Sequence, residues 1–260
     1  MIITGGLGVA IGQKTIIADI GIEAPAGAVT AIVGPNGSGK STLFGAISGT
    51  LAYSGSARIN GHEVARLSPA QASTMRAVLP QAMALAFPFT VREVVQLGIS
   101  DAEKPRDRAG RVDEALRRVD LTGFAGRYYQ ELSGGEQQRV QLARVLCQVW
   151  EPKVGGQPCS LLLDEPVSSL DIRHQLAIME VAREFAEAGG CVLVILHDLN
   201  LTAMYADLVH VLSRGQLAAS GTPSEVLTDE LLERVFGCRL KVGSVPPPHV
   251  PFVLPQSVRP

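Results

Sequence analysis

The sequence predicts an α/β fold: helices flank a mostly parallel β-sheet, with an antiparallel β part at the N-terminus and an inserted α-helical subdomain. Three observations predict it. Strand-like apolar runs fill much of the first 33 residues. A glycine-rich stretch, residues 34–39, then leads from one such run into a helical pattern. After a long, mostly helical interval, apolar runs return and alternate with a helix, the order that a parallel sheet requires.

The N-terminal elements are predicted from runs of apolar residues broken by glycine. Residues 7–11, 15–22 and 29–33 are expected to be strands. Residues 41–48 follow the glycine-rich stretch and have helical character.

The middle of the chain is predicted to be helical. Capping boxes at residues 68–71 and 90–93 predict two helix starts, the first with proline at its first helical position. Residues 111–119 place apolar side chains at helical spacing, whereas the charged stretch 101–110 predicts a loop.

The last third predicts three strands and the helices between them. Residues 160–163, 191–196 and 208–212 are strand-like, and residues 173–188 predict a helix between the first two. A capping box at residues 222–225 predicts a further helix. The proline-rich residues 245–260 are expected to be extended.

Composition excludes some classes of protein. The 260 residues carry a formal net charge of -2 and a pI of about 6.2, which gives no indication of a nucleic-acid partner. Apolar runs fall short of the roughly 20 residues that a membrane span needs, and no secretory signal is expected at the N-terminus. The four cysteines form no C-x-x-C pair, so neither zinc nor disulfides are indicated. The mean hydropathy of +0.21 indicates a large apolar core or an apolar docking surface.

Residues 34–41 predict a phosphate-binding loop. They fit G-x-x-x-x-G-K-[ST] and lie between a strand and a helix, a context that a chance glycine turn lacks. Glycines allow backbone N–H groups to face phosphate oxygens, and the helix N-terminus adds a positive dipole end. Lys40 is expected to reach the β- and γ-phosphates of ATP, and the Ser41 hydroxyl to bind Mg²⁺. The predicted nucleotide-binding residues here are Gly34, Pro35, Asn36, Gly37, Ser38, Gly39, Lys40, Ser41 and Thr42.

Two acids follow the apolar run 160–163. Ligands of parallel sheets bind beyond the carboxyl ends of the strands, so Asp164 suits the shell of Mg²⁺ and Glu165 suits a general base for an attacking water. The alternative is a solvated turn between strand and helix, which the phosphate-binding loop disfavours.

A second helix start has the character of an anion site. Ser133 and Glu136 form a capping box, but the two glycines between them, Gly134 and Gly135, are not needed for capping. Their bare amides at a helix N-terminus predict a second phosphate site. Because one ATP needs only one phosphate-binding loop, we expect two copies of the chain to pair head to tail around two ATP molecules.

The segments GPNGSGKST, LSGGE and LLLDEP together resemble the ABC ATPase family, over residues 34–197. The resemblance implies a P-loop NTPase (RecA-like) core. It implies that Gln81 senses Mg²⁺ and the attacking water, that Asp171 in residues 168–171 communicates across the dimer, and that His197 contacts the γ-phosphate. The other histidines are expected to be structural.

The resemblance also implies a domain division. Residues 1–85 and 151–240 form the expected nucleotide-binding core, 86–150 the inserted helical subdomain, and 241–260 a proline-rich tail. The family carries an aromatic residue near the start of the chain that stacks on adenine, and by position Ile11 stands there.

The partners implied are a second copy of the chain, two copies of a transmembrane permease and, indirectly, a periplasmic substrate-binding protein, with no nucleic acid. The expected location is peripheral, on the cytoplasmic face of the inner membrane. The apolar stretch 82–89 is expected to dock the permease, the alternative being packing within the helical subdomain; residues 127–130 are a second candidate contact.

Features shared with one subfamily indicate which molecule is transported. Residues 76–81, 86–91 and 196–201, and the long connection 151–158, are similar to the haemin-importer ATPases. Relatives that serve ferric-siderophore or cobalamin importers share much of this pattern and remain the alternative. Two other classes are disfavoured. A non-transport ABC ATPase acting on DNA or ribosomes would need a coiled coil or a second cassette, and a nucleotide kinase would not need LSGGE.

Overall fold

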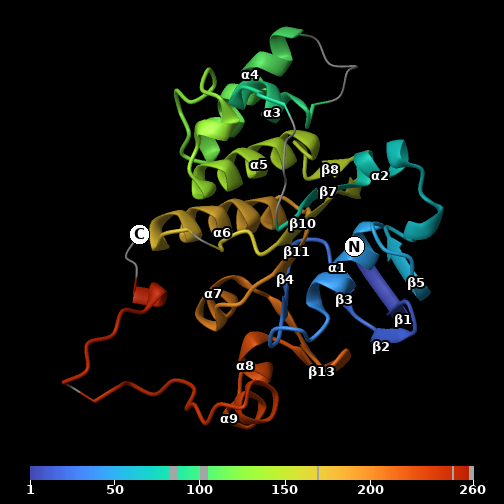
Figure 1. The fold of residues 1–260 in the computed structure, drawn as a ribbon, viewed down its shortest axis with the longest axis vertical. Helices are drawn as coiled ribbons and strands as arrows, with labels where there is room; N and C mark the ends of the chain where they lie inside the picture. The colour runs from blue at the N-terminus through green and yellow to red at the C-terminus, as the bar shows by residue number, and fades with distance from the viewer. Residues whose placement is uncertain (82–86, 100–104, 169, 248, 258–260) are drawn as a thin grey trace.

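The computed structural model describes residues 1–81, 87–99, 105–168, 170–247 and 249–257. Figure 1 shows an antiparallel β part beside a central sheet, with a group of helices stacked on the far side of that sheet. Among the described residues, no helix combines the length and the apolar character that crossing a bilayer requires.

The N-terminal β part is an antiparallel sheet with the order β2-β1-β5-β6, in which β3 also pairs with β1. Its strands are β1 (Ile2–Ile11), β2 (Lys14–Ile20), β3 (Glu23–Ala24), β5 (Ser54–Ile59) and β6 (His62–Glu63). The alternation of apolar and polar side chains along β1 explains its place, because one face of the strand is buried while the other meets water.

The central sheet has the order β13-β12-β4-β11-β10-β7, and every pair except β12 with β13 is parallel. Its strands are β4 (Ala28–Val33), β7 (Arg76–Leu79), β10 (Ser160–Asp164), β11 (Cys191–Ile195), β12 (Leu208–Ser213) and β13 (Gln216–Gly221). In register, Asp164 pairs with Ile195, and Ile195 with Ile32. The carboxyl ends of β4, β10 and β11 therefore meet at one edge.

The central strands read as continuous apolar runs because both of their faces are buried. Ile32, Leu162 and Leu193 belong to a core shared with the antiparallel sheet and with α1 (Lys40–Ser48). The alternating residues Ala31, Leu163 and Val194 face a second core, which contains the helices on the other side.

The helices of the second core form two layers over the sheet (Figure 1). The nearer layer contains α6 (Ile172–Glu187), which contacts β11 and β4. Beyond it α5 (Gly134–Gln148) contacts α3 (Val91–Gln96), α4 (Pro105–Arg118) and β7. The remaining helical segments are α2 (Pro69–Met75), α7 (Leu199–Tyr205), α8 (Pro223–Val226) and α9 (Asp229–Leu231). A two-stranded hairpin, β8 (Lys153–Val154) with β9 (Gln157–Pro158), follows α5.

One local prediction was wrong. The charged stretch 101–110 was predicted to be a loop, but α4 already begins at Pro105; residues 101–104 lie outside the described part of the chain. Proline is favourable in the first turn of a helix, where its missing N–H costs no hydrogen bond. Burial of Val112, Ala115 and Leu116 further along α4 then outweighs the polar character of its first turns.

Candidate functional site

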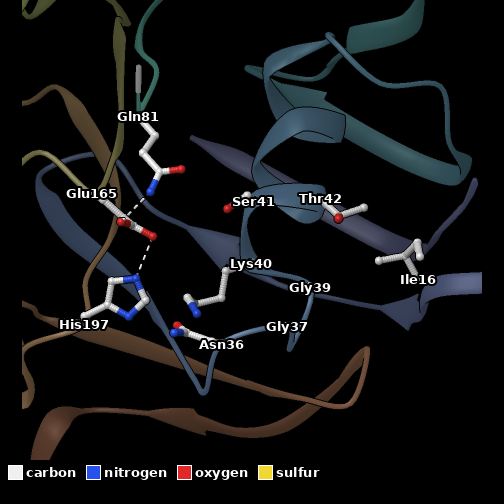
Figure 2. A pocket seen from close by; sticks show the side chains of 10 residues that line it. All are labelled: Ile16, Asn36, Gly37, Gly39, Lys40, Ser41, Thr42, Gln81, Glu165 and His197. Atoms are coloured by element: carbon white, nitrogen blue, oxygen red, sulfur yellow. Dashed lines mark hydrogen bonds and ion pairs between the residues drawn. The ribbon is translucent and has the colours of Figure 1, made fainter. Parts of the chain in front are cut away.

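Four chain segments meet beyond the carboxyl edge of the central sheet. Gly34 follows β4, Gln81 lies two residues after β7, Glu165 follows β10, and His197 lies two residues after β11. They border a cavity of about 410 Å³ (Figure 2). The lining residues are Ile16, Asn36, Gly37, Gly39, Lys40, Ser41, Thr42, Gln81, Glu165 and His197. The fold thus brings together residues that the sequence predicted on separate grounds.

The loop between β4 and α1 packs too tightly for side chains at two of its glycines. A Cβ on Gly34 (φ 150°) would lie 2.1 Å from the carbonyl oxygen of Leu212. A Cβ on Gly39 (φ 103°) would lie 2.4 Å from Cγ2 of Ile17. Only glycine fits at these positions, so the backbone of the loop lies against β12 and β2.

Lys40, the first residue of α1, is buried beneath the loop and 5% exposed. Its Nζ donates hydrogen bonds to the carbonyl oxygens of Gly34 (2.9 Å) and Pro35 (3.0 Å). Burial lowers the pKa of Lys40, and the nearby carboxylates of Glu165 and Asp164 oppose this shift. The ammonium group is therefore a buried positive charge beside an open cavity, which suits an anionic ligand.

Asp164 ends β10 and is 8% exposed. Among the described residues, no group hydrogen-bonds to its buried Oδ1. Burial raises the pKa of Asp164 to about 6; the charge of Glu165 adds to the shift, and Lys40 and His197 oppose it. A buried carboxylate oxygen without a protein donor has the chemistry of a ligand for a hard cation.

Glu165 is held in a left-handed backbone conformation (φ 51°) that is uncommon for residues other than glycine. Its Oε1 lies 2.6 Å from Nε2 of His197, and its Oε2 accepts a hydrogen bond from Nε2 of Gln81 at 2.8 Å (Figure 2). The side chain is only 14% exposed. The three residues predicted to be catalytic are therefore joined at one end of the cavity, with Glu165 in contact with both Gln81 and His197.

Two further residues contact Glu165, and sequence reasoning identified neither contact. Gln138, on α5, donates from Nε2 to the backbone carbonyl oxygen of Glu165 at 3.0 Å. Ser168 donates its hydroxyl to the same oxygen, also at 3.0 Å. No spacing in the sequence indicated either contact, because a polar residue on a helix has many possible partners.

Residues 133–136 and Asp171 do not line this cavity. Ser133 caps α5: its Oγ accepts the backbone N–H of Glu136 at 3.4 Å, and its own N–H donates to Oε2 of Glu136 at 2.8 Å. A Cβ added to Gly134 would meet open space. The second anion site therefore remains a prediction that a single copy of the chain does not complete.

The apolar residue at the cavity wall is Ile16, from β2. Ile11, the position where the resemblance placed the base-stacking residue, is 59% exposed and is not part of the lining. Folding of the β1–β2 hairpin, rather than position along the chain, decides which of the two side chains faces the cavity.

The raised pKa of Asp164 predicts a pH-dependent effect on stability. Because the pKa is higher in the folded chain than in the unfolded one, the folded state binds more protons between about pH 4 and pH 6. The free energy of unfolding then falls as pH rises through this window. In the absence of nucleotide and Mg²⁺, Asp164→Asn is expected to raise the free energy of unfolding by about 2 kcal/mol at pH 7.5, with a smaller change at pH 4. Urea denaturation at both pH values measures this, and a loss of stability at pH 7.5 would contradict it.

Comparison with known proteins agrees with this geometry. The family model described as ABC transporter matches residues 17–168, which include the glycine-rich loop, both acids and residues 133–136. The chain belongs to the ABC transporter family, and it is an ATP-binding subunit that hydrolyses ATP. The predicted α/β class with its antiparallel N-terminal part is confirmed.

Individual relatives match over nearly their whole length. The chain is 58% identical to the hemin import ATP-binding protein HmuV of Mesorhizobium japonicum over 260 residues, 99% of each chain. It is also 58% identical to the protein of the same name from Chelativorans sp., again over 99% of each chain. A solved dimeric structure of a bacterial ABC transporter cassette superposes with a TM-score of 0.74 at 25% identity, covering 86% of this chain and 99% of that one.

Proposed function

We propose that this chain is the ATP-hydrolysing subunit of a bacterial ABC importer of haem. The observation that carries the proposal is the 58% identity to hemin import ATP-binding proteins over 99% of the chain. That similarity extends well beyond residues 17–168, so it is not confined to the segments that the family model matches.

In the proposed ATP site, the backbone amides of residues 34–39 and the ammonium group of Lys40 hold the phosphates. Ser41, Gln81 and Asp164 would hold Mg²⁺, which neutralises charge on the β- and γ-phosphate oxygens when bound. The unpartnered Oδ1 of Asp164 supports this assignment. Thr42 and Asn36 border the same cavity.

Glu165 is proposed to orient the attacking water and to accept its proton. The contacts with Gln81 and His197 support this role, because they fix the direction of a carboxylate that lies in the cavity beside the phosphate loop. His197 is proposed to contact the γ-phosphate, and Gln81 to contact the water or Mg²⁺.

A second copy is proposed to complete each ATP site with its residues 133–136, while Asp171 serves communication between the copies. The dimeric cassette that this fold resembles supports such a pair. So does the position of Ser133 and Gly134 outside the cavity, at an exposed helix N-terminus.

The inserted helical subdomain, residues 86–150, is proposed to dock a transmembrane permease at the cytoplasmic face of the inner membrane. Phe87 supports this, because its side chain is 67% exposed and rests edge-on against Phe89, with ring centroids 6.4 Å apart. The side-chain amide of Gln130 donates a hydrogen bond to the carbonyl oxygen of Phe87 and so fixes the backbone there. Residues 82–86 of the proposed docking stretch lie outside the described part of the chain. Two permease copies and a periplasmic binding protein would complete the importer.

Uptake into proteoliposomes tests the transported molecule. The chain is reconstituted with the permease encoded beside its gene and the cognate binding protein, and labelled haem, a ferric siderophore and cobalamin are compared. ATP-dependent uptake of haem alone is expected. Uptake of another ligand would replace haem while keeping the importer, and intact ATPase activity without any uptake would contradict the transport function.

An aliphatic contact with the base predicts weak discrimination between nucleotides. Ile16 offers apolar contact but no aromatic face for stacking. The Kd values for ATP and GTP are therefore expected to agree within about threefold, a difference of less than 1 kcal/mol. Titration of each nucleotide in the presence of Mg²⁺ measures this, and a strong preference for ATP would contradict it.

A further inference from the structure

The segment between β10 and α6 begins at Glu165 and ends at Asp171. A side chain of α5 contacts its first residue, Glu165. Gln138 donates to the backbone carbonyl oxygen of Glu165 at 3.0 Å. Because Glu165 is in a strained left-handed conformation, this hydrogen bond helps to fix the peptide that sets the direction of its carboxylate.

The next residue of α5, Arg139, acts on the turn that follows α4. Arg139 is 8% exposed, and its Nη1 donates to the carbonyl oxygens of Val119 (3.1 Å) and Asp120 (2.9 Å). These bonds hold Asp120 in its own left-handed conformation (φ 56°). The Asp120 carboxylate then reaches α6, where its Oδ2 lies 2.9 Å from Nη2 of Arg173 and 3.7 Å from Nε2 of His174.

His174 links Asp120 to Asp171, the last residue of the segment. Its Nδ1 lies 2.8 Å from Oδ1 of Asp171, and that same oxygen accepts the N–H of His174 at 3.0 Å. The imidazole is 20% exposed, whereas the carboxylates of Asp120 and Asp171 on either side are 55% and 66% exposed. His174 was expected to be an ordinary structural residue, yet each of its ring nitrogens faces a carboxylate from a different part of the fold.

We propose that α5 positions Glu165 by holding the segment 165–171 at both ends, with Gln138 and His174 as positioning residues. Gln138 contacts Glu165 directly, and the adjacent Arg139 is linked to Asp171 through Asp120 and His174, so α5 is connected to both of these residues. The inference rests on the proposed role of Glu165 in hydrolysis. Because Ser133 is the N-cap of α5, this arrangement would make ATP turnover depend on the position of the second anion site.

Turnover kinetics of the full chain test this. Gln138→Glu is nearly isosteric but cannot donate to the Glu165 carbonyl, and His174→Ala removes both contacts of the imidazole. Each is expected to lower kcat by about tenfold, since small displacements of a reacting group are costly, with KM for ATP changed less than twofold. His174→Asn keeps an N–H donor near the Nδ1 position and should recover most of the lost kcat.

The matched control is Gln148→Ala. Gln148 lies on the same helix and donates from Nε2 to the backbone oxygens of Ser73 and Arg76, away from the segment. Its kcat should stay within twofold of the unchanged chain. Normal kcat in Gln138→Glu and His174→Ala, or a raised KM at unchanged kcat, overturns the inference. Glu165→Gln is measured in parallel: if it retains turnover, the proposed role of Glu165 fails instead, and with it the basis of the inference.

Discussion

Replacement of Glu165 by glutamine is expected to lower the rate of ATP turnover by about a thousandfold while ATP still binds. Removal of a general base costs on the order of 10²–10⁴-fold in rate. The Glu165 carboxylate is oriented by Gln81 at 2.8 Å and by His197 at 2.6 Å, so the loss should fall on the chemical step. The phosphate loop and Lys40 do not depend on this carboxylate for their backbone contacts.

Two measurements separate binding from chemistry in this variant. Phosphate release gives turnover, and nucleotide titration with size-exclusion chromatography follows binding and pairing; ATP without hydrolysis should trap a dimer. Glu187→Gln changes an exposed acid at the end of α6 and should leave turnover unchanged. Wild-type turnover in Glu165→Gln would show that another group acts as the base.

Lys40→Ala is expected to weaken ATP binding by about a hundredfold, close to 3 kcal/mol. The ammonium group is one of the few charges buried in the described core, and a phosphate would replace backbone carbonyl oxygens as its partner. Charge-assisted hydrogen bonds of this kind contribute roughly 1.5–3 kcal/mol each. Loss of the buried charge should not unfold the chain, because its neighbours in the loop are held by backbone geometry.

Isothermal titration with MgATP measures the Lys40→Ala effect. Lys153→Ala serves as the control, since Lys153 is exposed on the β8–β9 hairpin, remote from the cavity in sequence and outside its lining. A Kd unchanged by Lys40→Ala would refute the assignment of the phosphate contact. A loss of circular dichroism would instead mean that the side chain is needed for folding.

The sequence by itself determined the elements that depend on local chemistry. The predicted helix starts at Ser68, Thr90 and Ser133 are present, because a capping box needs only residues three apart. The central strands were predictable because burial on both faces leaves continuous apolar runs. The glycine-rich loop was also predictable from the sequence, because its backbone admits few alternatives to glycine.

Only the tertiary structure decided how distant residues meet. Gln81 and Glu165 are 84 residues apart, and Glu165 and His197 are 32 apart; their contacts follow from the parallel register of β7, β10 and β11. The same packing selects Ile16 for the cavity wall and raises the pKa of Asp164. The contacts of α5 with Glu165 and with the turn at Asp120 were likewise decided only by the tertiary structure. A spacing pattern reports which face of an element is apolar, whereas the partner of a polar side chain is fixed only when the elements pack.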